Sequence, residues 1–416
     1  MHRCAVCSTP RVTPPDTMSQ FWKYFSSLRL AGTFGEQDEL GERHRPSADC
    51  YKGGKRAGSL AEYLADCRQR VEAARPGPDN RQRARVVEGN SPFMLAPDGD
   101  GPVKRGILMV HGLSDSPYMM RDIANFFQQQ GFLVLAMQLP GHGTRPGDLL
   151  DTSWQDWVDE HQHLLGLLGA EVDDIYLLGF SIGAALNIYQ SVRNENIKGQ
   201  FLFAPAVRVL AVAQLTCPLA RLGKWWPRFA WFDTQPDSDD FKYESLTNRA
   251  ICEVHKMIGA LRRVSTLVER RIPLFVVASE NDATVDSDAI LHWFAQQKGA
   301  PRRMLYYSTG RPVVPSGVKT VVAKFPDRNI RSFAHTALLQ SPSNPHYGAR
   351  GSYRFCTHYY RLDRQKYQRC KDGQEDCLGE MFDESEDCPI IRRLTYNPLF
   401  DEMLAEIREF LLELDQ

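Results

Sequence analysis

The sequence predicts an α/β fold in which a mostly parallel sheet is flanked by helices and carries an inserted helical cap. Three observations predict it. Short apolar runs alternate with stretches of helical periodicity, the pattern of strands joined by right-handed crossover helices. The runs are continuously apolar, as expected for strands buried on both faces of a parallel sheet. About seventy residues then separate two consecutive strands, far more than a crossover needs, which indicates an insertion.

The N-terminal part predicts an arm followed by one helix. Residues 1–58 are punctuated by proline, glycine and charge without sustained periodicity, which is typical of an irregular arm. Ser59 with Glu62 three positions later forms a capping-box pattern, and apolar residues at helical spacing follow it to about Ala74. We therefore expect residues 1–90 to form an N-terminal arm and helix.

The core elements follow in regular alternation. The expected strands are apolar runs bounded by glycine, proline or charge, at 106–110, 132–136, 175–178, 199–203, 273–278 and 320–323. The expected helices show apolar residues three and four apart, at 119–130, 154–168, 184–189 and, as the last packing helix, 400–414. This arrangement predicts a core made of residues 91–206 and 270–416, with residues 207–269 as the cap.

Composition excludes several classes of protein. The chain has 416 residues, of which 43% are hydrophobic, so it has ample material for a buried core and is not globally disordered. The formal net charge of -1 lacks the basic excess of a nucleic-acid binder. No run approaches the ~18 apolar residues of a membrane span, and the first thirty residues hold no apolar signal-peptide core. We therefore expect neither a membrane span nor a signal peptide, and a cytoplasmic location by default.

The ten cysteines bear on the cellular location as well. Cys4 and Cys7 form a CxxC pair, but no second pair lies at zinc-site spacing, so no metal site is predicted. Four further cysteines share the polar segment 345–390, namely Cys356, Cys370, Cys377 and Cys388. Because this segment is too polar to build a core of its own, we expect at least one stapling disulfide among them, with any of three pairings. A disulfide implies a periplasmic or secreted protein, so the location stays open.

A candidate nucleophile lies in Gly179-Phe-Ser-Ile-Gly183. This GxSxG pattern directly follows an expected strand and opens an expected helix, which is the context of a nucleophile elbow. The alternative is a glycine-rich turn with an ordinary serine. A serine hydroxyl is a weak nucleophile at neutral pH, so Ser181 needs a histidine base and a carboxylate that orients this base.

The candidate carboxylate is Asp282, in the polar turn after the expected strand 273–278. An aspartate there can instead cap its own turn, the usual role of this residue in loops. The neighbouring acids Glu280, Asp286 and Asp288 are rivals, and we favour Asp282.

The candidate base is His335, which follows the last expected core strand and has small residues beside it. His346 and His358 are alternatives, and any single one of them could be a solvated loop histidine. The chain order Ser181, Asp282, His335 favours His335, because one fold requires this order of nucleophile, acid and base.

The remaining candidates are the groups that would bind the oxyanion and the residues that would contact the acyl chain. His111-Gly112 follows the first apolar strand, and the backbone N–H groups of Leu113 and Ile182 are the expected oxyanion donors. His111 is predicted to support this loop rather than act as a second base. In the insertion, Trp225 and Trp226 could line an acyl pocket or pack against the body.

Taken together, these motifs resemble the α/β-hydrolase superfamily. Within it, the turn Leu139-Pro-Gly-His-Gly143 and the following Trp154-Gln-Asp-Trp157 are similar to those of serine aminopeptidase-like (monoacylglycerol-lipase-like) hydrolases and bacterial carboxylesterases. The resemblance covers about residues 105–336 and the final helix. It does not include the first hundred residues or the segment 345–390.

The resemblance implies a serine esterase that acts on a small, acyl or lipid-like ester through an acyl-enzyme, without a metal or organic cofactor. The same residues would also serve a peptidase, a thioesterase or an acyltransferase, because these enzymes differ in pocket shape rather than in fold. A non-catalytic binding protein on this fold is the remaining alternative. The sequence does not indicate an oligomeric state.

Overall fold

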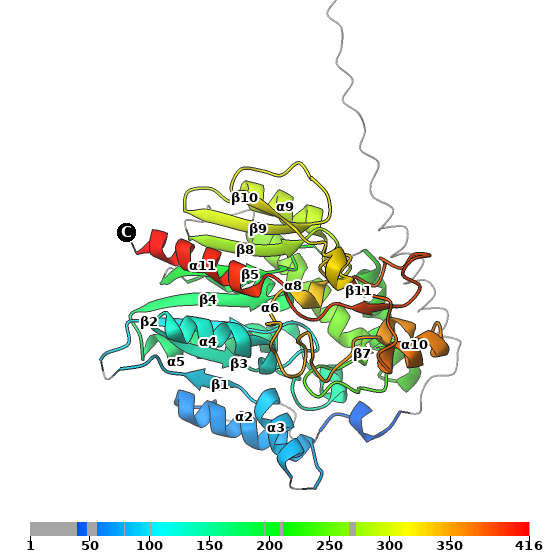
Figure 1. Ribbon diagram of the computed structural model, residues 1–416. Coiled ribbons are helices and arrows are strands. Elements are labelled where there is room, and N and C mark those ends of the chain that lie inside the picture. The colour runs from blue at the N-terminus through cyan, green and yellow to red at the C-terminus, as the bar shows by residue number, and fades with distance from the viewer. Residues whose placement is uncertain are drawn as a thin grey trace, which may run out of the picture.

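An eight-stranded sheet forms the centre of the chain in the computed structural model (Figure 1). Its strands are β1 (Phe93–Leu95), β2 (Arg105–Val110), β3 (Phe132–Met137), β4 (Asp174–Phe180), β5 (Ile197–Phe203), β8 (Leu274–Ser279), β9 (Arg302–Ser308) and β10 (Val318–Val322). They lie in the order β1-β3-β2-β4-β5-β8-β9-β10. Neighbours pair in parallel except β1 with β3. The predicted mostly parallel sheet is confirmed.

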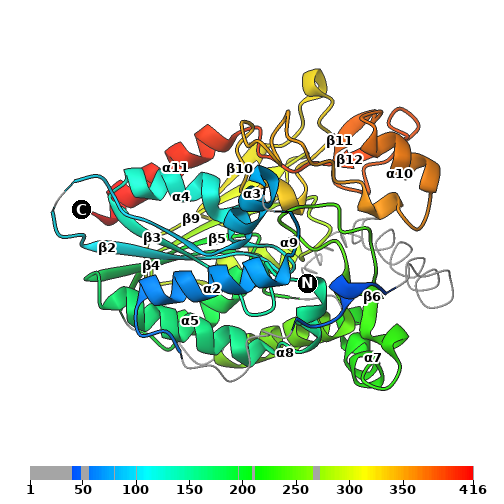
Figure 2. The same cartoon turned by 90° about the horizontal axis from the view of Figure 1, so that it is seen from below.

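Helices cover both faces of this sheet, which confirms the predicted α/β class. The helices around the sheet are α2 (Leu60–Ala74), α3 (Arg81–Asn90), α4 (Arg121–Gln129), α5 (Trp154–Gly169), α6 (Ile182–Ser191), α8 (Asn248–Ser265), α9 (Ser287–Gln296) and α11 (Phe400–Leu414). Helices α4 and α11 lie on one face, and α5 and α8 lie on the other (Figure 2). The strands β2, β3 and β4 are almost wholly buried between these layers, as their continuous apolar runs require.

The structure describes residues 40–47, 56–78, 80–99, 101–194, 196–208, 211–265 and 272–415. Most of the predicted N-terminal arm, with Cys4 and Cys7, lies outside these residues. None of the helices in the described part of the chain has both the length and the apolarity of a membrane span.

Local sequence signals set the ends of several elements. The Ser59 hydroxyl accepts a hydrogen bond from the backbone N–H of Glu62 at 3.2 Å, so Ser59 caps α2 as predicted. The reciprocal bond of a capping box is replaced, because the Glu62 carboxylate accepts the N–H of Gly58 at 2.6 Å. Gly131 follows α4 with φ of 84°, a conformation that glycine adopts without steric cost. Among the strands of the large sheet and the helices around it, β1, β9, α3 and α9 were not predicted from the sequence.

The insertion between β5 and β8 contains more than helices. It holds α7 (Thr216–Leu222), a small antiparallel pair of β6 (Trp231–Asp233) with β7 (Leu246–Thr247), and α8. The disulfide Cys217–Cys252, which the sequence did not indicate, joins α7 to α8. Because α8 also packs against α5 and α6, part of the insertion belongs to the helical layer of the sheet. We propose residues 207–269 as the cap on these grounds.

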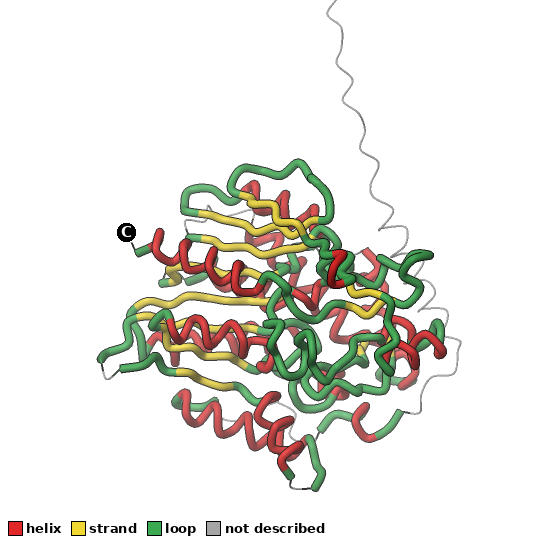
Figure 3. The backbone as a smooth tube through the Cα atoms, in the orientation of Figure 1, coloured by secondary structure: helices red, strands yellow, loops and turns green. Residues whose placement is uncertain are grey.

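The loops that follow the strands gather at one end of the sheet (Figure 3). The register of the parallel strands explains why. Val110 at the end of β2 lies opposite Gly179 near the end of β4, and Phe180 lies opposite Phe203 at the end of β5. The expected functional residues after β2, β4 and β8 therefore emerge at a common edge.

The Cys-rich segment 345–390 and the residues after it form a compact unit. It contains α10 (Arg364–Lys371) and β11 (Cys377–Gly379), which pairs in parallel with β12 (Ile391–Arg393). Two disulfides, Cys356–Cys370 and Cys377–Cys388, confirm the expected stapling. The expectation that the segment builds no core is wrong: the four half-cystines are themselves buried and pack with Tyr359, Ile390 and Ile391.

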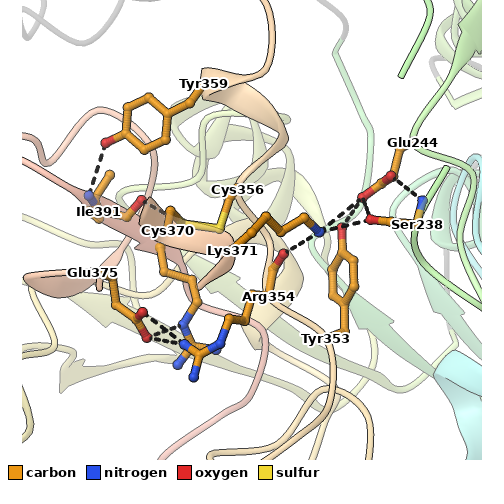
Figure 4. The surroundings of a disulfide bond; sticks show 11 residues. Ser238, Glu244, Tyr353, Arg354, Cys356, Tyr359, Cys370, Lys371, Glu375 and Ile391 are labelled. Atoms are coloured by element: carbon orange, nitrogen blue, oxygen red, sulfur yellow. Dashed lines mark hydrogen bonds and ion pairs between the residues drawn. A yellow bond between two sulfur atoms is a disulfide. The ribbon is translucent and has the colours of Figure 1, made fainter. Parts of the chain in front are cut away.

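This unit also contacts the insertion. Lys371 of α10 donates a hydrogen bond to the Ser238 hydroxyl at 2.9 Å and lies 3.9 Å from the Glu244 carboxylate (Figure 4). The disulfide Cys356–Cys370 fixes the helix that carries Lys371, so it also fixes this link.

A thiol count tests the disulfides. Six of the ten cysteines are paired in the structure, so protein denatured without reductant should titrate at most four thiols. After reduction the same sample should titrate ten. Ten thiols before reduction would contradict all three disulfides and favour a reducing compartment.

Candidate active site

Ser181 occupies a sharp turn between β4 and α6. Its backbone has φ of 55° and ψ of -115°, a region that residues with a side chain rarely adopt. Hydrogen bonds hold this strained conformation: the N–H of Ser181 donates to the carbonyl of Phe203 at 2.9 Å, and its carbonyl accepts from Ala206 at 3.2 Å. This is the geometry that the GxSxG pattern predicts for a nucleophile elbow.

The two glycines of the pattern are required by close backbone contacts. A Cβ atom on Gly179 would lie 2.5 Å from the backbone nitrogen of Ala184. A Cβ atom on Gly183 would lie 2.2 Å from the carbonyl oxygen of Val110. Because real Cβ atoms do not approach so closely, only glycine lets α6 start directly against the strand ends.

Asp282 and His335 are in direct contact. The Nδ1 atom of His335 lies 2.6 Å from Oδ2 of Asp282, and both side chains are buried. The other oxygen, Oδ1, accepts the backbone N–H groups of Thr284 at 2.7 Å and Val285 at 3.0 Å. Asp282 therefore has both of the roles that the sequence allowed. It caps its own turn, and it orients the imidazole of His335.

The imidazole lies beside the turn that carries the serine. The ring of His335 packs on the ring of Phe180, the residue before Ser181, with 4.7 Å between their centroids. The fold thus places the Asp282–His335 pair next to the turn that carries Ser181. The arrangement is chemically suited to a nucleophile, a base and an acid that holds the base.

The rival acids are engaged elsewhere. Glu280 accepts hydrogen bonds from the Ser308 hydroxyl and from the backbone N–H of Thr309. Asp286 caps α9 through the N–H of Ala289 and forms an ion pair with Arg208. Asp288 lies in the first turn of α9, where the helix dipole stabilises its negative charge.

The rival histidines also have other surroundings. His358 is buried in the Cys-rich unit, where burial lowers its pKa to about 3. His346 forms a second histidine–aspartate pair, with 2.9 Å between Nε2 and Oδ1 of Asp239, and its Nδ1 lies 2.9 Å from the Ser352 hydroxyl. Ser352 lacks the positive φ of an elbow and does not open a helix, so this set has no N-terminal amide to bind an oxyanion.

The loop after β2 packs directly on the start of α6. His111 is fully buried and bridges this loop to the next strand end: its Nδ1 lies 2.9 Å from the carbonyl of Gly112, and its Nε2 accepts the N–H of Leu139 at 3.1 Å. Burial lowers the pKa of His111 to about 4, which keeps the imidazole neutral and able to accept this bond. The supporting role expected for His111 fits these contacts.

The expected oxyanion donors lie on the two sides of this junction. Ile182 is the first residue of α6, and Leu113 follows Gly112 in the loop. A Cβ atom on Gly183 would also lie 2.6 Å from the carbonyl oxygen of His111, which shows how closely the loop approaches the helix start. The assignment of these two N–H groups stays a prediction.

Two residues of the insertion bind the loop after β2, which the sequence did not indicate. The Nζ atom of Lys242 forms a largely buried ion pair with Asp115 and lies 3.4 Å from the carbonyl of Leu113. The N–H of Tyr243 donates to the carbonyl of Ser114 at 2.8 Å. No local pattern marks Lys242, because its partner is 127 residues away in the chain.

Trp225 and Trp226 lie just after α7 and are 80% and 58% exposed. They are therefore not packed against the body, which was the alternative to lining an acyl pocket. Their role in binding substrate stays a prediction. Within the described residues, no group of three or more His, Cys, Asp or Glu side chains is arranged to hold a metal ion.

The sequence is similar to those of known proteins. A family model described as serine aminopeptidase, S33, matches residues 101–311. A thermostable monoacylglycerol lipase of Bacillus sp. (strain H-257) is 26% identical over 201 residues, which are 48% of this chain and 77% of that protein.

Solved structures show similar but distant folds. One comes from work on LipS and LipT, two metagenome-derived lipolytic enzymes, with a TM-score of 0.42 and 20% identity over 52% of this chain and 87% of that chain. A monoacylglycerol lipase of Paleococcus ferrophilus has a TM-score of 0.41 and 18% identity over 52% of this chain and 88% of that chain. Likeness at this level carries no information about substrate.

Proposed function

Because the chain belongs to the serine aminopeptidase S33 family of α/β-hydrolases, we propose that it is a serine hydrolase that cleaves carboxylic esters. The observation that carries the proposal is the 2.6 Å contact between Asp282 and His335 beside the strained turn at Ser181. A binding protein on this fold would have no need for a buried acid–base pair next to a strained serine, whose backbone conformation costs about 1–3 kcal/mol.

The proposed reaction uses each residue in one role. His335 takes the proton of the Ser181 hydroxyl as this oxygen attacks the ester carbonyl, and Asp282 stabilises the imidazolium that forms. The N–H groups of Leu113 and Ile182 bind the oxyanion of the tetrahedral intermediate. The alcohol leaves with the proton from His335, and a water activated by the same histidine releases the acid from the acyl-enzyme.

The proposed substrate is a small ester with an acyl or lipid-like chain. The similarity to a monoacylglycerol lipase supports this class. The exposed indole rings of Trp225 and Trp226 are the residues we propose to contact the acyl chain, since large aromatic surfaces gain most from apolar contact. The disulfides support maturation in an oxidising compartment, which we propose as periplasmic or extracellular.

A substrate panel tests this proposal. We expect turnover of p-nitrophenyl esters and monoacylglycerols in a chain-length series, and stoichiometric labelling of Ser181 by a fluorophosphonate. Aminoacyl anilides and acyl-CoA thioesters should be poorer substrates by kcat/KM. A preference for the anilides would instead indicate a peptidase, and a preference for the thioesters a thioesterase. A protein that neither turns over an ester nor reacts with the fluorophosphonate would be a binding protein on this fold.

A further inference from the structure

A carboxylate from the Cys-rich unit is buried against the Asp282–His335 pair. Glu380 is only 1% exposed and lies in the loop that the Cys377–Cys388 disulfide closes. This segment is not part of the pattern by which the chain resembles its family. Its position at the site therefore needs an explanation from the contacts of Glu380 itself.

One oxygen of Glu380 joins the two loops that carry the pair. Its Oε2 atom accepts the backbone N–H of His335 at 3.3 Å and the backbone N–H of Ala283, the residue after Asp282, also at 3.3 Å. The other oxygen, Oε1, accepts the N–H of Met381 at 2.8 Å. Because Asp282 and His335 are 53 residues apart in the chain, a shared acceptor fixes the distance between their backbones.

An arginine neutralises this buried carboxylate and adds a further tie. The Nε atom of Arg393 lies 2.6 Å from Oε1, and its Nη2 donates to Oε2 at 2.9 Å. The same Nη2 group donates to the Thr284 hydroxyl at 2.8 Å, so Arg393 holds the loop of Asp282 as well. A buried ion pair gains little net stability, because desolvation of both charges offsets their attraction, but losing one partner leaves the other charge uncompensated.

The loop that carries Glu380 is attached along the segment leading to His335. The N–H of Leu378 donates to the carbonyl of Asn329 at 2.8 Å, and the N–H of Arg331 donates to the carbonyl of Leu378 at 2.7 Å. The N–H of Glu380 donates to the Ser332 hydroxyl at 3.1 Å. The disulfide closes this loop at both of its ends, so Glu380 is presented from a constrained ring of the chain.

We propose that Glu380 is a positioning residue for the Asp282–His335 pair and that the Cys377–Cys388 disulfide keeps it in place. The proposal rests on the function proposed above. Catalytic groups must be held within about 0.5 Å and 10–20° of the productive geometry. Glu380 acts through the backbone of the two loops, and reduction of the disulfide weakens this hold. Activity thereby depends on an oxidising environment.

The first test compares two carboxylates of the same unit. Glu375 is also largely buried and pairs with Arg354 at 2.6 Å and Arg392 at 2.8 Å, on the side of the unit that holds the Cys356–Cys370 disulfide (Figure 4).

Glu380→Gln keeps the shape of the side chain but offers an amide N–H₂ group where acceptors are needed. We expect kcat to fall about 10- to 100-fold with KM within about twofold, as for a misplaced catalytic group. Glu375→Gln should keep kcat within about threefold at a comparable loss of Tm. Equal kcat in the two variants would overturn the proposal.

A second comparison uses the two disulfides of the unit. The double variant Cys377→Ser with Cys388→Ser should lower kcat as Glu380→Gln does. The variant Cys356→Ser with Cys370→Ser should lower Tm and leave kcat within about threefold of wild type, because its disulfide holds α10 rather than the loop of Glu380. The same kcat in both double variants would contradict the role given to Cys377–Cys388.

A spectroscopic readout separates this proposal from the proposed function. We expect the proton between His335 Nδ1 and Asp282 to give a far-downfield proton resonance whether or not an ester is cleaved. We expect this signal to be lost or broadened in Glu380→Gln and retained in Glu375→Gln. If wild type shows the signal but hydrolyses no ester, the proposed function fails and the positioning role is still decided by the two variants. An unchanged signal in Glu380→Gln would refute the positioning role of Glu380 and would leave the proposed function unaffected.

Discussion

Ser181→Ala is expected to lower kcat by at least ~10³-fold while the fold stays intact. In the proposed mechanism the oxygen of this hydroxyl forms the acyl-enzyme, so its removal leaves only the catalysis that substrate binding and the oxyanion donors supply. The positive φ of this position is as accessible to alanine as to serine, and the hydrogen bonds to Phe203 and Ala206 involve only the backbone. Steady-state kinetics on a p-nitrophenyl ester, together with the thermal midpoint of the variant, measure both expectations.

The matched control for this substitution is Ser352→Ala. Ser352 belongs to the second serine–histidine–aspartate set, and its hydroxyl contacts His346. Its backbone does not form a nucleophile elbow, and no helix begins after it. Its variant should keep kcat within about twofold and should still react with a fluorophosphonate. Near-wild-type turnover in Ser181→Ala, or loss of labelling in Ser352→Ala, would show that the nucleophile is assigned to the wrong serine.

Three of the strands that the sequence predicted have the same environment along almost their whole length. Strands β2, β3 and β4 are buried on both faces, so their residues form unbroken apolar runs. Strand β9 was missed because it begins with Arg302 and Arg303 and has only two aliphatic residues before its tyrosines. Its Arg303 forms ion pairs with Glu409 and Glu413 of α11, which compensates for a charge at the start of a core strand.

The candidate site was predictable to the extent that its geometry is local. The turn at Ser181 is set by two glycines and by the strand and helix on either side, all within a few residues. The choice of Asp282 and His335 depended on chain order and on their position after strands. The contacts of Glu380 and Lys242 could not be inferred, because they arise where segments 45 and 127 residues apart meet.

The cysteines show the same limit. A group of four within a polar segment predicted a disulfide, and the structure confirms it. The judgement that the segment was too polar for a core was wrong, since the sulfur atoms and three or four apolar side chains suffice to fill a small interior. The third disulfide joins Cys217 to Cys252 across two helices of the insertion, at a separation of 35 residues that carries no local signal.

Asp282→Asn is expected to lower kcat by about 10⁴-fold at neutral pH, as it does in serine hydrolases that use this constellation. The structure gives a specific reason. The Oδ1 atom already accepts two backbone N–H groups, from Thr284 and Val285, so the amide oxygen of asparagine would remain there. The amide N–H₂ group would then face His335 Nδ1, which has to become an acceptor. The imidazole proton moves to Nε2, and the ring can no longer take the proton of Ser181.

Two neighbouring acids provide the controls for this prediction. Asp286→Asn keeps an oxygen that caps α9 and should be mildly impaired, and Glu280→Gln affects only the contacts with Ser308 and Thr309. Both should keep kcat within about fivefold of wild type, since neither carboxylate contacts His335 among the residues that the structure describes. All three variants are compared by kcat at saturating ester, with Tm measured alongside. If Asp286→Asn were instead the variant with the large loss of kcat, the acid would lie four residues further along the same loop, and the contact between Asp282 and His335 would be structural.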